Sequence, residues 1–253
     1  MRKSFRFLSM AFMALTLSFA ATSCGDDGDD ISDGTSNSDG TSSGSSKKDL
    51  GNGIYLINGH RFVDLGLPSG TLWAETNIGA EESTDDGAYF AFGETEPKSY
   101  FDFSNCKYGA SSDNLTKYNS SDGKFYLDKE DDAAYVNWGA PCRIPTDGQF
   151  TELRNPNNCT WTWTTKTASD GSFVNGYVVS SVKNGNSIFL PASGYRYNGN
   201  RRNHGSYGYY WSKTISTSDD YYNAFCLYFR SSERKLLRSS RCYGHTVRPV
   251  AKP

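Results

Sequence analysis

The chain has 253 residues, and its 15% aromatic content, 17 Tyr and 25 Gly favour one domain of short strands and many loops. Each buried ring removes a large apolar area from water, so a core forms without many aliphatic residues, and a helical bundle is disfavoured. The net charge of −2 conceals an uneven distribution, since the 11 basic and 3 acidic residues from Arg196 onward give that part a balance of +8.

Residues 1–23 have the pattern of an export signal. Three basic residues precede an apolar run that is too short to span a bilayer as a mature helix. The run ends in Ala21-Thr22-Ser23-Cys24, which resembles the lipobox of bacterial lipoproteins, whose cysteine is acylated. We therefore predict that Cys24 is lipidated and anchors the protein to a membrane through its acyl chains. The alternative is an ordinary cleaved signal with an incidental cysteine.

An acidic run at 25–30 follows this cysteine directly and resembles the surface-export signal of Bacteroidetes lipoproteins. The alternative is a plain solvated tether. Residues 24–52 are rich in Ser, Gly and Asp and have little to bury, so we expect a flexible tether, followed by a single folded domain at 53–253. This organisation predicts a lipid-anchored outer-membrane protein exposed on the cell surface, which argues against nucleic acid as a partner.

Short strands are expected in the first half of the domain. Their predicted ranges are Ile54–Ile57, Arg61–Leu65, Thr71–Ala74 and Tyr89–Phe92. Asn58-Gly59 is a strong tight-turn signal between the first two. Residues 94–121 lack a regular pattern and are expected to form a long loop region.

Two helices are expected in the middle of the chain. Asp128 is placed to cap a helix at Lys129–Trp138, and the acidic residues at 130–132 complement the positive end of its dipole. Thr146 and Gln149 have the spacing of a capping box that opens a second helix. The acidic residues could instead form a metal site, although adjacent carboxylates in a first turn are mostly dipole complements.

After Cys159 the pattern is that of strands. Trp161 and Trp163 alternate, and Asn184-Gly185 turns a strand at Tyr177–Val182 into another at Ser187–Leu190.

The last sixty residues continue this pattern. Phe225, Leu227 and Phe229 are expected to point inward, and the alternate residues Cys226, Tyr228 and Arg230 outward. An exposed basic turn is expected at 234–241. Val247 and Val250 belong to a last strand, with Pro249 at a sheet edge or at the end of that strand.

The basic segment is also rich in Tyr, and Tyr and Arg favour recognition surfaces. The predicted ligand-binding residues are Arg201, Arg202, His204, Tyr207, Tyr209, Tyr221, Tyr222, Arg234 and Arg238. Such a surface attracts anionic ligands, for example acidic glycans. The alternative is that the basic residues are solvated or packed against the acidic body and that many of the rings belong to the core, as we expect for Tyr210 and Trp211.

The remaining chemistry is sparse. Cys226 and Cys242 stand on candidate neighbouring strands and could form a disulfide, which an export route permits. The three His lack metal-ligand spacing, and there is no phosphate loop, nucleophile elbow or positioned Ser/His/Asp set. We therefore expect neither enzymatic activity nor a cofactor.

Eight short motifs stand in order along the domain: VDLGLPSGTLWA (63–74), YFAFGET (89–95), DDAAYVNWG (131–139), RIPT (143–146), WTWTT (161–165), NGNSIFLPASGYR (184–196), YYWS (209–212) and HTVRPV (245–250). Together they resemble the Fibrobacter succinogenes major paralogous domain, a family common in surface lipoproteins of gut Bacteroidetes. The resemblance covers residues 53–250. It implies an α+β domain with a C-type lectin-like fold, in which two helices flank an antiparallel sheet and long loops cross one end.

The end of the chain also resembles the last strand of formylglycine-generating-enzyme-like proteins and of retroelement-diversified ligand binders. In those binders the variable face precedes this strand, which corresponds here to 196–243. The Glu-Pro-Asn and Trp-Asn-Asp motifs of calcium-dependent sugar-binding lectins are missing, so calcium-dependent sugar recognition is not implied.

The sequence therefore predicts a cell-surface binding module that recognises an extracellular glycan or protein through its C-terminal loops. The alternative is a structural subunit or tip component of a surface appendage or lipoprotein complex.

Overall fold

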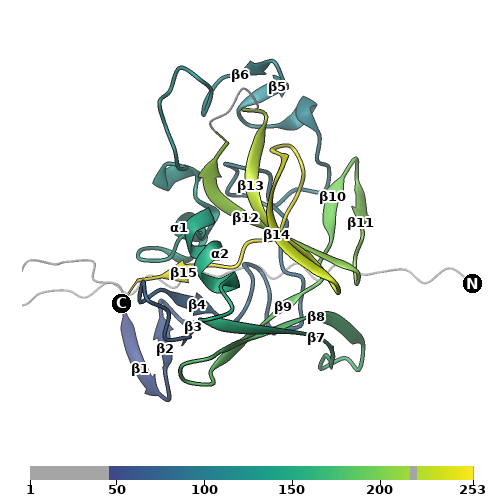
Figure 1. Ribbon diagram of the computed structural model, residues 1–253. Helices are drawn as coiled ribbons and strands as arrows, with labels where there is room; N and C mark the ends of the chain where they lie inside the picture. The colour runs from purple at the N-terminus through teal and green to yellow at the C-terminus, as the bar shows by residue number, and fades with distance from the viewer. Residues whose placement is uncertain (1–45, 217–220, 253) are drawn as a thin grey trace, which may run out of the picture. The chain divides into compact units, whose positions relative to one another are not determined.

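The computed structural model describes residues 46–216 and 221–252. Within these residues the chain is mostly antiparallel β-structure with two α-helices, which agrees with the α+β class predicted from the sequence (Figure 1). Cys24, the signal segment and most of the tether lie outside the described residues. Neither of the two helices is long or apolar enough to cross a membrane.

A five-stranded antiparallel sheet joins the beginning of the described chain to its end. Its strands, in spatial order, are β1 (Lys47–Gly51), β2 (Ile54–Ile57), β3 (His60–Asp64), β4 (Leu72–Ala74) and β15 (Val250–Ala251). Asn58 and Gly59 both have positive φ, 50° and 84°, which fits the predicted tight turn between β2 and β3. Strand β1 corrects the predicted boundary, because paired structure begins at Lys47, inside the range assigned to the tether.

Two three-stranded antiparallel sheets form the C-terminal half. One consists of β7 (Cys159–Thr167), β8 (Phe173–Ser181) and β9 (Ser187–Pro191), and the other of β12 (Tyr207–Ile215), β13 (Asn223–Arg230) and β14 (Glu233–Ser240). Two hairpins complete the set: β5 (Gly109–Ser111) with β6 (Asn114–Leu115), and β10 (Tyr195–Tyr197) with β11 (Asn200–Arg202). The expected basic turn at 234–241 is wrong: residues 233–240 are strand β14, paired with β13 along its whole length.

The first helix is shorter than the sequence predicts. The expected helix at Lys129–Trp138 is a 3-10 turn, η2 (Lys129–Asp131), followed by α1 (Ala133–Trp138). Asp132, rather than Asp128, caps α1, accepting from the amides of residues 134 and 135 at 3.0 and 3.2 Å. A further 3-10 turn, η1 (Phe103–Asn105), lies in the loop region.

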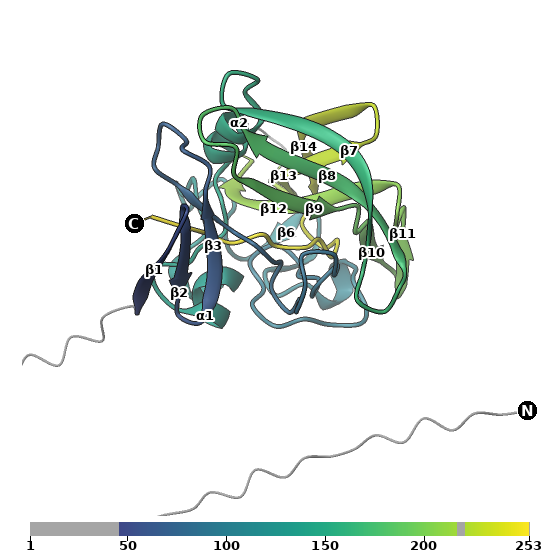
Figure 2. The same ribbon diagram turned by 90° about the horizontal axis from the view of Figure 1, so that it is seen from below.

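The second helix is confirmed. Helix α2 (Asp147–Arg154) opens with the predicted capping box of Thr146 and Gln149. It lies against β7 and β12–β14, as Figure 2 shows.

Two large apolar clusters share strands β4 and β13. Cys226 of β13 lies in one cluster, and Leu227 and Phe229 lie in the other. The predicted outward set on this strand is therefore partly wrong, because Cys226 is 0% exposed and Tyr228 only 9%. Strand β13 is covered on both sides, which removes the simple alternation that its sequence suggests.

The chain before the last strand contains a buried arginine that joins three segments. The guanidinium of Arg248 donates to Asn77 Oδ1 at 2.8 Å, to the carbonyl of Ala74 at 3.1 Å and to that of Phe189 at 2.9 Å. A buried cation without such partners costs several kcal/mol, so this position tolerates few other residues.

The expected strand at 89–92 is reduced to a single bridge between Phe90 and His245.

Candidate functional site

The register of β12–β14 decides which side chains share a face of that sheet. Tyr209 lies opposite Tyr228, and Tyr228 opposite Lys235. Residues directly opposite each other in an antiparallel sheet point to the same side, so these three share one face. Tyr207, opposite Arg230, belongs to the same face because it lies two residues from Tyr209.

The segment at 243–246 carries this face across to the hairpin β10–β11. It bridges to β10 through Arg196 and Gly244, and to β12 through Tyr210 and Thr246. Tyr243 consequently lies beside the tyrosines of β10.

Six tyrosines form a continuous row of contacting rings, which we call the tyrosine face: Tyr195, Tyr197, Tyr207, Tyr209, Tyr228 and Tyr243. The ring centroids are 4.8 Å apart for Tyr197 and Tyr243, and 5.3 Å for Tyr243 and Tyr195. From Tyr195 to Tyr209 the distance is 5.1 Å, and from Tyr209 to Tyr228 it is 5.3 Å. Tyr207 closes the row at 5.8 Å from Tyr228. All but Tyr228 are partly exposed.

The hydroxyls of this face act as hydrogen-bonding groups in their neutral form. Burial raises the pKa of Tyr209 to about 12 and also raises the pKa of Tyr228 and of Tyr243. These three phenols therefore stay protonated at physiological pH and both donate and accept hydrogen bonds.

Cationic groups border the rings. The Arg202 guanidinium lies 5.6 Å from the centroid of Tyr197, and Lys235 Nζ 5.5 Å from that of Tyr228. Arg230 hydrogen-bonds with Tyr207 and pairs with Glu233 at 3.3 Å. Rigid rings with one hydroxyl each, beside forked cationic donors, suit ligands that offer both apolar faces and hydroxyl or carboxylate oxygens.

The structure places only three of the nine predicted ligand residues on this face: Arg202, Tyr207 and Tyr209. Arg201 and His204 lie elsewhere, because both contact Asp86 Oδ2, at 2.6 and 3.0 Å. They line a cavity of about 450 Å³ whose wall also contains Glu82 and Asp170.

Arg234 and Arg238 correct the predicted basic face. They lie opposite Phe229 and Phe225, so the sheet alternation points them to the side away from the tyrosine face. The Arg234 guanidinium lies 5.7 Å from the Trp161 ring.

The two remaining predicted residues precede β13. Tyr221 packs against the apolar core, and Tyr222 is 40% exposed.

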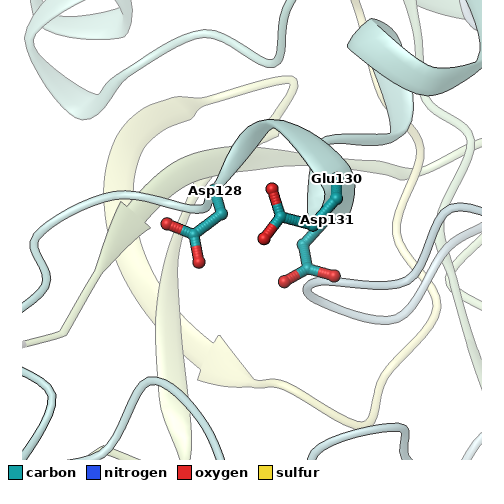
Figure 3. Close-up of side chains that lie close together, drawn as sticks. All are labelled: Asp128, Glu130 and Asp131. Carbon is teal, nitrogen blue, oxygen red and sulfur yellow. The ribbon is translucent and has the colours of Figure 1, made fainter.

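The acidic cluster has a structural role in this fold. Oxygen atoms of Asp128, Glu130 and Asp131 lie within 4.8 Å of one another, as metal ligands do (Figure 3). However, Asp131 accepts from Lys107 and Lys117 at 2.8 and 2.6 Å, and Lys117 also lies 2.8 Å from Asp128. Ammonium groups therefore occupy the positions from which a metal ion would be bound.

The predicted pairing of Cys226 with Cys242 is not present. Both are free thiols; Cys226 lies in the apolar core, opposite Trp211 and Leu237, and the thiol beside Cys242 is that of Cys106. Pairing on neighbouring strands was the basis of the prediction, and it fails because residue 242 lies beyond the end of β14.

The sequence did not identify most of the tyrosine face. Tyr195 and Tyr197 lie close to a predicted strand, Tyr228 lies in the alternating pattern of 225–230, Tyr243 has polar neighbours, and Lys235 is next to the predicted ligand residue Arg234. Period-two alternation of 233–240 would have separated Lys235 from Arg234, had that segment been recognised as a strand.

Comparison of the chain with protein-family models, with curated proteins and with solved structures found no match.

Proposed function

We propose that this protein is a lipid-anchored, surface-displayed binding module without enzymatic activity, which recognises an extracellular glycan or protein through the tyrosine face. The observation that carries the proposal is the row of six contacting rings bordered by Arg202, Arg230 and Lys235. Its location rests on the lipobox-like sequence at Cys24 and the acidic run behind it.

The ligand class follows from the chemistry of the face. Sugars and peptides stack on aromatic rings and offer oxygens to phenolic hydroxyls, and the bordering cations favour an acidic member of either class. Contacting rings lose little conformational entropy on binding, because their neighbours already restrict them. The mostly antiparallel fold with two helices is compatible with the C-type lectin-like fold that the sequence motifs suggest.

A direct test compares neighbouring residues on opposite faces of β14. The full chain is probed on arrays of neutral glycans, acidic glycans and extracellular proteins, and the strongest signal is then titrated. Tyr207→Ala and Lys235→Ala should each weaken binding at least about tenfold, as expected for residues at the centre of an interface. Both side chains lie on the tyrosine face.

Arg234→Ala is the matched control, since it removes a cation one residue away that points to the other side. It should change affinity less than about twofold, in the range expected of a residue outside the interface. Equal losses for Lys235→Ala and Arg234→Ala would show that only the net charge matters, and full binding by Tyr207→Ala would rule out the tyrosine face.

One feature favours a structural role as the second candidate. Strand β1 is an edge strand whose five residues are all exposed, and an open edge accepts a strand from another protein. Stable co-purification of the full chain with a large surface assembly, lost when Leu50 is replaced by Pro, would favour this alternative.

A further inference from the structure

Two cysteines that are far apart in the sequence lie side by side in the structure. The side chains of Cys106 and Cys242 interact with each other, and Ser240 Oγ lies 3.2 Å from Cys242 Sγ. Cys106 is partly exposed, whereas Cys242 is buried.

The backbone around both cysteines is held in place by independent contacts. The guanidinium of Arg241, next to Cys242, donates to the carbonyl of Tyr118 at 2.8 Å, and the backbone carbonyl of Arg241 accepts from the amide of Phe92 at 2.9 Å. Cys106 and Arg241 also line the same small cavity. The loop region and the C-terminal segment are therefore packed together beside the two thiols.

We propose that Cys106 and Cys242 are a covalent cross-linking site and form a disulfide in the exported protein. The reaction is thiol–disulfide exchange with a small-molecule or protein disulfide. The partly exposed Cys106 sulfur attacks one sulfur of the oxidant and forms a mixed disulfide with it, while the other sulfur of the oxidant leaves as a thiol that carries the Cys106 proton. Cys242 then loses its proton and attacks Cys106, releasing the second thiol. In total the two cysteines lose two electrons and two protons, and the oxidant becomes two thiols.

The order of these steps follows from access to solvent, because Cys106 is the partly exposed thiol, although its hydrogen bond with Cys242 and its burial raise the pKa of Cys106. Hydrogen bonds from Cys106 and from Ser240 lower the pKa of Cys242, so this is the thiol that ionises more readily. It is also the one that must act as the second nucleophile, because it is shielded from solvent and faces Cys106.

The bond would join the long loop region to the segment that carries Tyr243. It closes a loop that contains both helices and β7–β14, and a cross-link of this length restricts the unfolded chain strongly. Of the other three cysteines of the domain, Cys142 and Cys226 are buried in one apolar cluster and Cys159 is buried in the other. The proposal concerns a different part of the molecule from the bound ligand, and it holds whether or not the tyrosine face binds one.

The primary test is a thiol map of the full chain, extracted from its own membranes and alkylated under denaturing, non-reducing conditions. We expect a peptide pair that links Cys106 to Cys242, with a mass two hydrogens lower than the sum of the reduced peptides, and alkylated Cys142, Cys159 and Cys226. Reduced protein incubated with oxidised glutathione should regain the same pair. Free Cys106 and Cys242 after that incubation, a stable glutathione adduct on Cys106, or a link from Cys242 to Cys226 would each overturn the proposal.

A second measurement compares the melting temperature of each protein before and after reduction. The oxidised wild-type protein should melt at least about 5 °C higher than the reduced one, from the expected size of a disulfide contribution. This difference should vanish in Cys106→Ser and persist in Cys142→Ala, since residue 142 lies outside the pair. Because each variant is its own reference, a general loss of stability does not affect the result.

Discussion

His245 is fully buried and packed between aromatic rings. It stacks on Trp211 with ring centroids 4.0 Å apart, and its Nε2 lies 3.0 Å from Ser239 Oγ. Its Nδ1 has no hydrogen-bond partner in the structure. Burial lowers the pKa of His245 from 6.5 to about 3, because the imidazolium would lose its hydration without gaining a counterion.

This residue makes the stability of the fold pH-dependent. The unfolded chain binds a proton at His245 below about pH 6.5, whereas the folded chain does so only near pH 3, so the free energy of unfolding falls as the pH falls through this interval. Between pH 7 and pH 5 the loss due to this residue should be about 2 kcal/mol. Urea unfolding at the two pH values measures it.

His245→Phe should unfold with a smaller pH dependence over the same interval, even if the substitution lowers stability at both values. An unchanged slope in His245→Phe would show that another group titrates.

The docking of hairpin β10–β11 depends on a glycine. Gly194 has φ 65°, and a Cβ there would lie 2.1 Å from the carbonyl oxygen of Arg202 and 2.8 Å from the amide nitrogen of His204. The end of β11 thus passes directly over the residue that precedes β10, and this close approach positions Tyr195 and Tyr197.

Gly194→Ala should therefore destabilise the protein by about 3 kcal/mol, since it combines backbone strain with a backbone clash. Gly199→Ala is the control, because φ is similar (72°) but its nearest neighbour is the Tyr100 ring at 3.5 Å. It should cost only about 1 kcal/mol. Thermal and urea unfolding of both variants give the comparison, and equal costs would mean that conformational strain alone is responsible.

The elements that could be predicted from the sequence are those whose chemistry is local. Asn58-Gly59 specifies its turn, and Thr146 with Gln149 specifies the start of α2, without reference to the rest of the chain. Strand β14 was missed because Arg, Lys and Ser alternate with Leu in an irregular way, and only its pairing with β13 makes it a strand. The tyrosine face depends on register and on bridges between distant segments, which no local pattern encodes.

One buried carboxylate attaches the long loop region to the rest of the described molecule. Asp131 is inaccessible to solvent and accepts from the side chains of Lys107, Lys117, Tyr108 and Tyr118. Although burial opposes ionisation, hydrogen bonds from Lys107 and Lys117 hold the pKa of Asp131 well below its usual range.

Asp131→Asn should lower the free energy of unfolding at pH 7 by about 3 kcal/mol. This value is at the lower end of the range for breaking a buried ion pair, because Lys107 and Lys117 are both partly exposed. In the wild-type protein the stability contributed by this carboxylate is complete above the pKa of the unfolded chain, about 4, and is lost progressively as the pH falls below it. Asp131→Asn should show a flatter acid profile.

Glu130→Gln provides the control, since Glu130 is exposed and lies 3.4 Å from the same Lys117. Its effect should stay within about 0.5 kcal/mol. Comparable losses for the two variants, measured by urea unfolding, would contradict the assignment of Asp131 as the residue that holds the loop region.

The pairing of β15 with β4 has a consequence for biosynthesis. Trp73 lies opposite Val250, so a nascent chain on the ribosome cannot complete the five-stranded sheet until almost all of the domain has been made. The carbonyl of Ala74 likewise gains its hydrogen bond from Arg248 only when the end of the domain has been made. Contacts of such high sequence separation slow folding and leave the polypeptide without its complete sheet for longer.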